Sequence, residues 1–151
     1  MARRAVTAVF GTQNQAYDAA SEIKKLEKSK GVHVRQAAIV TKDSKGNVHV
    51  PDTKGDEVPW GTLGGPIVGG LIGLIAGPAG AAVGAAGGLF AGWTGDMVRL
   101  GMDEDVLRSV AAEVNPGDTA IVAELDEAST APVDMIVASH DGRIYRTDLW
   151  A

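Results

Sequence analysis

The chain has 151 residues, a formal net charge of -5, 45% hydrophobic residues and no cysteine. This length suits one domain with a real core, or one small domain with an appendage. The acidic balance argues against a nucleic-acid surface, which needs clustered lysine and arginine, and the lack of cysteine excludes disulfides, thiolate metal sites and cysteine nucleophiles.

The first third of the chain predicts a β-α-β unit followed by a hairpin. Residues 5–10 form a short apolar run of the kind found in buried strands. Thr12 is a suitable N-cap for a helix whose small and apolar residues recur at helical spacing, and Gly31 ends that helix. Residues 32–42 have strand composition, and the turn and short strand in residues 43–50 complete a β-hairpin.

An uncharged, glycine-rich segment occupies residues 61–95. Its glycines recur every four residues in two series, separated at Pro78, where a turn is indicated. Residues four apart share one face of a helix, so each series would form a stripe without side chains, against which a second backbone packs closely. We therefore predict a glycine-zipper hairpin of two helices, residues 61–77 and 79–95, with Pro78 at its tip. The packing glycines are Gly61, Gly65, Gly69, Gly73 and Gly77 in the first series, and Gly80, Gly84, Gly88 and Gly92 in the second.

The last third repeats the plan of the first. Residues 103–114 predict a helix with an acidic first turn and an apolar stripe. A turn at residues 115–118, a strand at 119–125, a short helix capped by Thr130 and a final strand at 143–149 follow. Two β-α-β units in one small chain predict an α+β, ferredoxin-like (split β-α-β) sheet with both helices on one face.

The glycine-rich hairpin would then be an insertion between the two halves of this domain. We expect residues 1–57 to form the first half with its β-hairpin, residues 58–98 the hydrophobic helical hairpin, and residues 99–151 the docking helix and the second half.

Two kinds of surroundings would stabilise such a hairpin. At about 1.5 Å per residue each leg would be about 25 Å long, slightly under the ~30 Å of a bilayer's hydrocarbon core. Trp60 and Trp93 would meet at one end of an antiparallel hairpin, where they would act as interfacial or inter-subunit anchors. Glycine is a poor helix former in water, so the hairpin needs either lipid or close packing between many copies. A bilayer is the favoured surrounding, and a soluble assembly with buried hairpins is the alternative.

No arrangement of residues in the sequence is typical of an active site. The phosphate-binding motif G-x-x-x-x-G-K-[ST] and the dinucleotide fingerprint are both absent. His33, His49 and His140 lack the spacing of metal ligands, and a helix N-terminus accounts for the acidic residues 103–105. We expect no catalytic residues, no cofactor, no bound metal and no identifiable small-molecule substrate.

Several short motifs, in the same order over nearly the whole chain, resemble the bacterial and archaeal proteins grouped as domain of unknown function 1269. They follow a first-half strand and alanine-rich helix, and comprise Val40-Thr41-Lys42-Asp43, Gly61-Thr62-Leu63-Gly64-Gly65, Gly101-Met102-Asp103 and Pro116-Gly117-Asp118-Thr119-Ala120. These proteins are described as membrane-associated, and the resemblance implies the same here. It supplies no reaction and no catalytic residues.

The sequence therefore predicts a non-enzymatic protein that forms homo-oligomers through its glycine zipper, in or on a membrane. The alternatives are a soluble particle, ring or filament with the hairpins buried between subunits, and a binding module that uses the sheet for a small ligand or a regulatory partner. The expected partners are the protein itself and a lipid bilayer, without nucleic acid. We expect the cytoplasmic side of the inner membrane, or the cytoplasm, and no secretion, because the apolar run at residues 5–10 is too short for a signal peptide.

Overall fold

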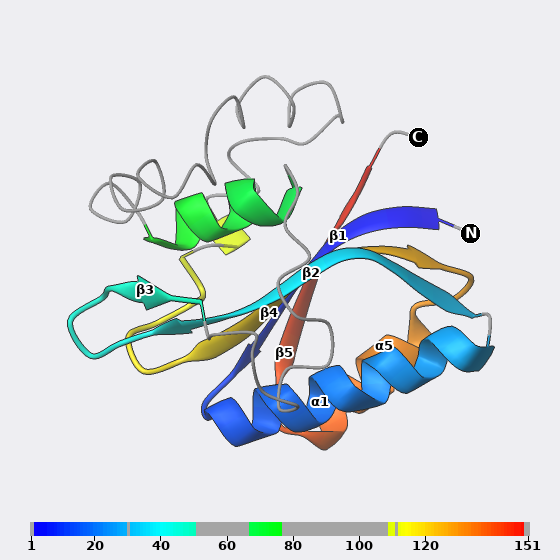
Figure 1. Ribbon diagram of the computed structural model, residues 1–151, viewed down its shortest axis with the longest axis horizontal. Coiled ribbons are helices and arrows are strands. Elements are labelled where there is room, and N and C mark those ends of the chain that lie inside the picture. Colours follow the sequence, from blue (N-terminus) through cyan, green and yellow to red (C-terminus); the bar gives the residue numbers. More distant parts are fainter. Residues whose placement is uncertain (1, 30, 51–66, 77–108, 111, 150–151) are drawn as a thin grey trace.

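The chain forms an α+β structure around a five-stranded antiparallel sheet (Figure 1). The computed structural model describes residues 2–29, 31–50, 67–76, 109–110 and 112–149, and every structural statement below concerns these residues. The strand order is β3-β2-β4-β1-β5, and each neighbouring pair is antiparallel. The strands are β1 (Ala2–Phe10), β2 (Val32–Lys42), β3 (Val48–His49), β4 (Thr119–Glu127) and β5 (Arg143–Asp148).

Helices cover both faces of this sheet (Figure 1). One face carries α1 (Gln13–Leu26), which continues into the 3-10 turn Glu27–Ser29, and α5 (Ala131–Ser139). The opposite face carries the helical residues 67–76, drawn in green. Because the central strands are covered on both sides, β4 is a nearly continuous buried run instead of an alternation of buried and exposed residues.

The first helix begins as its sequence predicts. The Thr12 hydroxyl accepts a hydrogen bond from the Gln15 backbone N–H at 3.2 Å, which satisfies one of the amides that a helix start leaves unpaired. Ala16, Ala19 and Ala20 are fully buried, so the helix lies close to the sheet. The resulting core joins α1, α5 and the sheet face that carries Phe10, Ile39, Ile121 and Leu125.

A β-bulge in β2 changes which side chains face which helix. The register with β4 shifts between Val34 and Gln36, so one extra residue interrupts the alternation of the strand. Val34 and Ile39 therefore lie in the same core, under α1, although their numbers differ by an odd count. The same shift places Gln36 on the opposite face with Ala38 and Val40, under residues 67–76.

The predicted strands and turns of both flanks are confirmed, with small differences at their ends. β1 begins at Ala2, earlier than residue 5, and β4 extends to Glu127. Thr130 occupies the N-cap position of α5, but its side chain makes no capping hydrogen bond, which differs from the prediction. The domain boundaries at 57/58 and 98/99 lie outside the described residues.

Within the predicted hairpin, residues 67–76 are helical, as expected for the first leg. Over the described parts of the chain, no helix is both long enough and apolar enough to cross a bilayer.

Candidate functional site

The candidate site is the contact between residues 67–76 of the glycine-rich segment and the sheet. Helical residues 67–76 bring a row of large apolar side chains onto the sheet face, where alanine and valine predominate. The helix contributes Ile67, Val68, Leu71, Ile72 and Ile75, each at most 4% exposed, and the sheet contributes Ala5, Val9, Ala38, Val40, Ala120 and Val122. Small side chains on the sheet allow the helix to approach closely. This part of the glycine-rich segment therefore belongs to the core of its own chain.

A chain of buried polar groups meets the beginning of this helical stretch. The Val68 backbone N–H donates to Gln36 Oε1 at 2.9 Å, and Gln36 Nε2 donates to Glu124 Oε1 at 2.9 Å. Arg3 Nε in turn donates to the other oxygen of the Glu124 carboxylate. Gln36 is 8% exposed and Glu124 2% exposed, so these bonds lie out of water, where a missing partner costs most. Each polar atom of the Gln36 amide has a partner of the required kind.

A lysine meets the other end of the same stretch. Lys42 Nζ donates to the Ile75 carbonyl at 3.2 Å and to the Val114 carbonyl at 3.3 Å. A backbone carbonyl accepts hydrogen bonds and a lysine ammonium group carries three donors, so one side chain can bond both carbonyls. The backbone of Lys42 is also held, because its N–H donates to the Asp118 carbonyl at 2.9 Å.

Two of the predicted packing glycines, Gly69 and Gly73, lie in the described helix. Successive helix residues are about 100° apart around the axis, so these two lie roughly 150° from the centre of the sheet-facing side chains. The glycine stripe is therefore on the side of the helix away from the sheet. Gly69 is buried and Gly73 half-buried. The other predicted residues, Gly61, Gly65, Gly77, Gly80, Gly84, Gly88, Gly92, Trp60, Trp93 and Pro78, lie outside the described residues.

The three histidines are separate from this contact. His49 Nε2 lies 2.9 Å from Asp43 Oδ2 in the β2–β3 hairpin, and His140 contacts the Glu22 carboxylate between α5 and α1. His33 is exposed on β2. No group of three or more potential ligands among the described residues could hold a metal ion.

Sequence reasoning missed Gln36, Lys42 and Glu124. All three lie in strands that were predicted, but their role depends on contacts across the fold. One signal was present, because a glutamine and a glutamate interrupt strands that are otherwise largely apolar. A buried polar side chain in such a position needs a partner, although the sequence does not say which.

Comparison with known proteins gives a family and no function. No curated protein and no solved structure matches the chain. A family model described as "Protein of unknown function (DUF1269)" matches residues 62–151, which is more than half of the chain and includes the glycine-rich segment apart from Gly61. The chain belongs to the DUF1269 family.

Proposed function

We propose that this is a non-enzymatic protein that assembles into homo-oligomers through the glycine-rich helical hairpin expected for residues 58–98. The observation that carries the proposal is the orientation of the helical residues 67–76. Their apolar side chains lie on the sheet, whereas Gly69 and Gly73 lie on the side away from it. A helix side without side chains allows another helix backbone to approach closely, and this is the contact that a glycine zipper makes. Gly69 is buried within the single chain and Gly73 is half-buried, so Gly73 is the more accessible of the two.

The body of the protein would serve as the scaffold that presents this segment, and we propose that it is a split β-α-β, or ferredoxin-like, domain. Without β3, the strand order is β2-β4-β1-β5, so each β-α-β unit has a strand of the other unit between its own two. Both crossover helices, α1 and α5, lie on one face. That arrangement leaves the other face for the glycine-rich insertion.

A hairpin path for the insertion is supported by the contacts of Lys42. Its ammonium group bonds the carbonyl of Ile75, before residues 77–108, and the carbonyl of Val114, after them. The chain positions on either side of residues 77–108 therefore lie close together, as a hairpin between them requires. We propose that the tip of the hairpin lies at Pro78 and that the second leg, which carries the second glycine series, follows it within residues 77–108.

The packing of residues 67–76 also bears on the surroundings. Their large apolar side chains contact the protein's own sheet, so they are not available to lipid in this arrangement. This favours assemblies in which the hairpins are buried against protein, either at the inner membrane surface or as a soluble particle in the cytoplasm. It disfavours a hairpin with both legs in the bilayer. A binding module with an open sheet face finds no support in the described residues, since helices cover both faces.

A matched pair of glycine variants tests the proposal. Gly73→Leu adds a side chain to the glycine stripe, and we expect a lower oligomer mass in light scattering because the facing backbones are forced apart. Gly11→Leu makes the same change at an exposed bend, where an added Cβ has its nearest neighbour at 3.9 Å, and should leave the mass unchanged. Circular dichroism establishes that both variants are folded.

Fractionation of expressing cells identifies the surroundings. Recovery that requires detergent supports assembly at the membrane, and a discrete large particle in plain buffer supports the soluble assembly. A monomeric wild-type protein in both buffer and detergent, or an unchanged mass in Gly73→Leu, would contradict the proposed function.

A further inference from the structure

Apolar packing alone does not determine where the helical residues 67–76 sit on the sheet. The sheet face beneath them carries alanines and valines, which offer few features that distinguish one position of a helix from the next. Hydrophobic burial is non-directional and scales with area. A shift along the axis, accompanied by a small rotation about it, could bury a similar area. It would also change the direction in which Gly69 and Gly73 are presented.

The directional contacts come from two side chains of one strand. Gln36 accepts the Val68 N–H, and Lys42 donates to the Ile75 carbonyl. Gln36 and Lys42 are six residues apart on β2, about 20 Å, and Val68 and Ile75 are seven apart on the helix, about 10 Å. The two side chains therefore reach the helix from opposite ends. A displacement by one helical turn, about 5.4 Å, would break both hydrogen bonds.

Neither side chain is free to follow the helix. The Gln36 amide is held by Glu124, which Arg3 holds in turn, so three strands contribute to its position. Lys42 is held by its second bond, to the Val114 carbonyl, and by its backbone pairing with Asp118. Both contacts therefore have a fixed origin on the sheet.

We propose that Gln36 and Lys42 are positioning residues that set the register and rotation of residues 67–76, and thereby the direction of the glycine stripe. The second half of this inference rests on the proposed function, because the direction matters for assembly. The first half concerns contacts within one chain. The pair would make the assembly specific, because hydrogen bonds supply the direction that apolar burial lacks.

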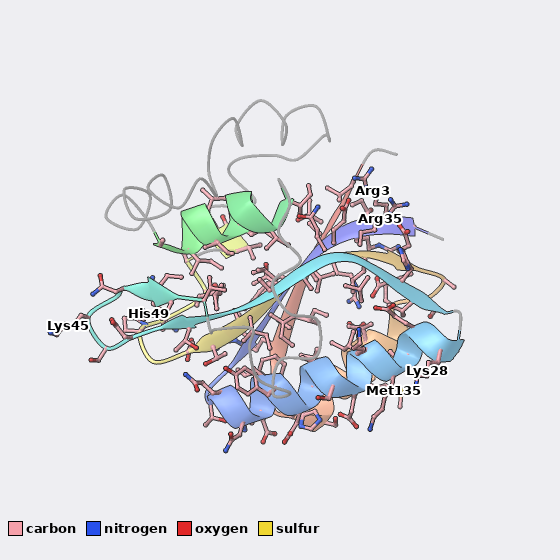
Figure 2. The ribbon with its side chains drawn as sticks, viewed as in Figure 1. Arg3, Lys28, Arg35, Lys45, His49 and Met135 are labelled. Carbon is pink, nitrogen blue, oxygen red and sulfur yellow. The ribbon has the colours of Figure 1, made fainter. Side chains whose placement is uncertain are left out.

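Hydrogen–deuterium exchange of the full-length protein tests the positioning role. We expect Gln36→Leu and Lys42→Met each to increase amide exchange in residues 67–76 by about tenfold or more, with exchange in β4 unchanged. Lys42→Arg keeps a hydrogen-bond donor, so amide exchange in residues 67–76 should stay slow in this variant. The matched controls are Gln13→Leu, at an exposed glutamine whose side chain bonds Thr41, and Lys45→Met, at the exposed hairpin tip (Figure 2).

The inference would be overturned if both variants exchanged residues 67–76 at the wild-type rate. It would also be overturned if exchange rose equally in residues 67–76 and in β4, since that indicates a general loss of stability. Because no step of this test depends on association, its failure is separate from that of the proposed function. The oligomer masses of the same samples test the second half of the inference, the link to assembly. Lys42→Met should broaden the oligomer distribution, and Lys42→Arg should not. An unchanged distribution in Lys42→Met would overturn the link to assembly.

Discussion

Asp43 shows how a single side chain organises the β2–β3 hairpin. Its Oδ1 accepts the backbone N–H groups of Lys45 and Asn47, both at 2.9 Å, and its Oδ2 contacts His49. The hydrogen bond from His49, followed by that from the Asn47 amide, lowers the pKa of the Asp43 carboxyl below its ordinary value. Gly46, with φ of +86°, supplies the left-handed conformation that the turn requires.

The first prediction concerns this pKa. We expect an NMR titration to place the pKa of Asp43 below the ordinary aspartate value, and His49→Ala to move it upward, because the largest cause of the shift is removed. Since the carboxylate form is favoured in the folded state, its contribution to hairpin stability is present at neutral pH and is lost as the pH falls through the folded-state pKa. His33→Ala serves as the control. An identical Asp43 titration in His49→Ala and wild type would contradict this account.

Gly142 leaves no room for a side chain in the described part of the chain that surrounds it. A Cβ built there would lie 2.5 Å from the Phe10 ring and 2.8 Å from a methyl group of Val137, and both of these residues are buried. We expect Gly142→Ala to lower the free energy of unfolding by about 1–3 kcal/mol, because a filled core must move to accept it.

Gly31→Ala is the control for Gly142, since the nearest atom to an added Cβ lies 3.8 Å away. Urea denaturation of both variants checks the prediction. Equal stabilities would show that Phe10 and Val137 adjust without cost.

At the scale of elements, one carboxylate connects strands of the sheet to α5. Glu127, at the end of β4, is 1% exposed and accepts hydrogen bonds from Arg4 on β1 and from Arg146 on β5. Arg146 also bonds Asp134 and the Thr130 carbonyl at the start of α5. Burial lowers the pKa of Arg146, but its hydrogen bonds to Glu127 and Asp134 raise it by more, so the pKa lies above the ordinary arginine value. The pKa of Arg4 is also raised, chiefly by its hydrogen bond to Asp148.

We expect Glu127→Gln to lower the free energy of unfolding by about 3 kcal/mol, because the change removes the negative charge that compensates two arginines in a buried position. The control is the neighbouring Asp126→Asn. Asp126 pairs with Arg35, whose side chain is 47% exposed, and water screens an exposed pair of this kind, so it contributes much less than a buried one. Thermal or urea unfolding measures both variants. A Glu127→Gln protein as stable as Asp126→Asn would show that the network contributes little.

At the scale of the whole molecule, residues 67–76 form a third layer. The sheet has α1 and α5 on one face and this helical stretch on the other, and the two cores are separated by the sheet itself (Figure 1). A segment that composition alone favours for lipid is therefore used within the protein. Leu71 is 2% exposed in this layer.

We expect Leu71→Ala to lower the free energy of unfolding of the whole chain by about 2–5 kcal/mol, because it leaves a cavity between helix and sheet. Met135→Ala, at an α5 residue that is 71% exposed, should change it by much less (Figure 2). Urea unfolding followed by circular dichroism compares the two. If residues 67–76 were surrounded by lipid instead of the sheet, Leu71→Ala would leave the unfolding of the α+β body unaltered.

The sequence by itself determined most of the local structure of the flanks, although the helix predicted for residues 103–114 does not reach its predicted end, because residues 112–114 are a turn and an irregular residue. The Thr12 cap, the 32–42 strand and the 43–47 turn follow from short-range rules: a hydroxyl that bonds an early helix amide, a run of β-formers, and an aspartate and glycine in a turn. The repetition of two β-α-β units also predicted the α+β class, because each unit brings its own strands and helix. The helical character of residues 67–76 followed from spacing and apolar content.

The tertiary structure alone decided what lies against residues 67–76. Their apolar side chains would be buried from water equally well by lipid, by another copy of the chain or by a sheet, and composition does not distinguish these partners. Gln36 reaches Val68, 32 positions away, because a bulge turns it to that face of the sheet. Glu124 joins it across 88 positions. Such contacts depend on register and on a backbone irregularity, which are properties of the assembled sheet and not of any stretch of sequence.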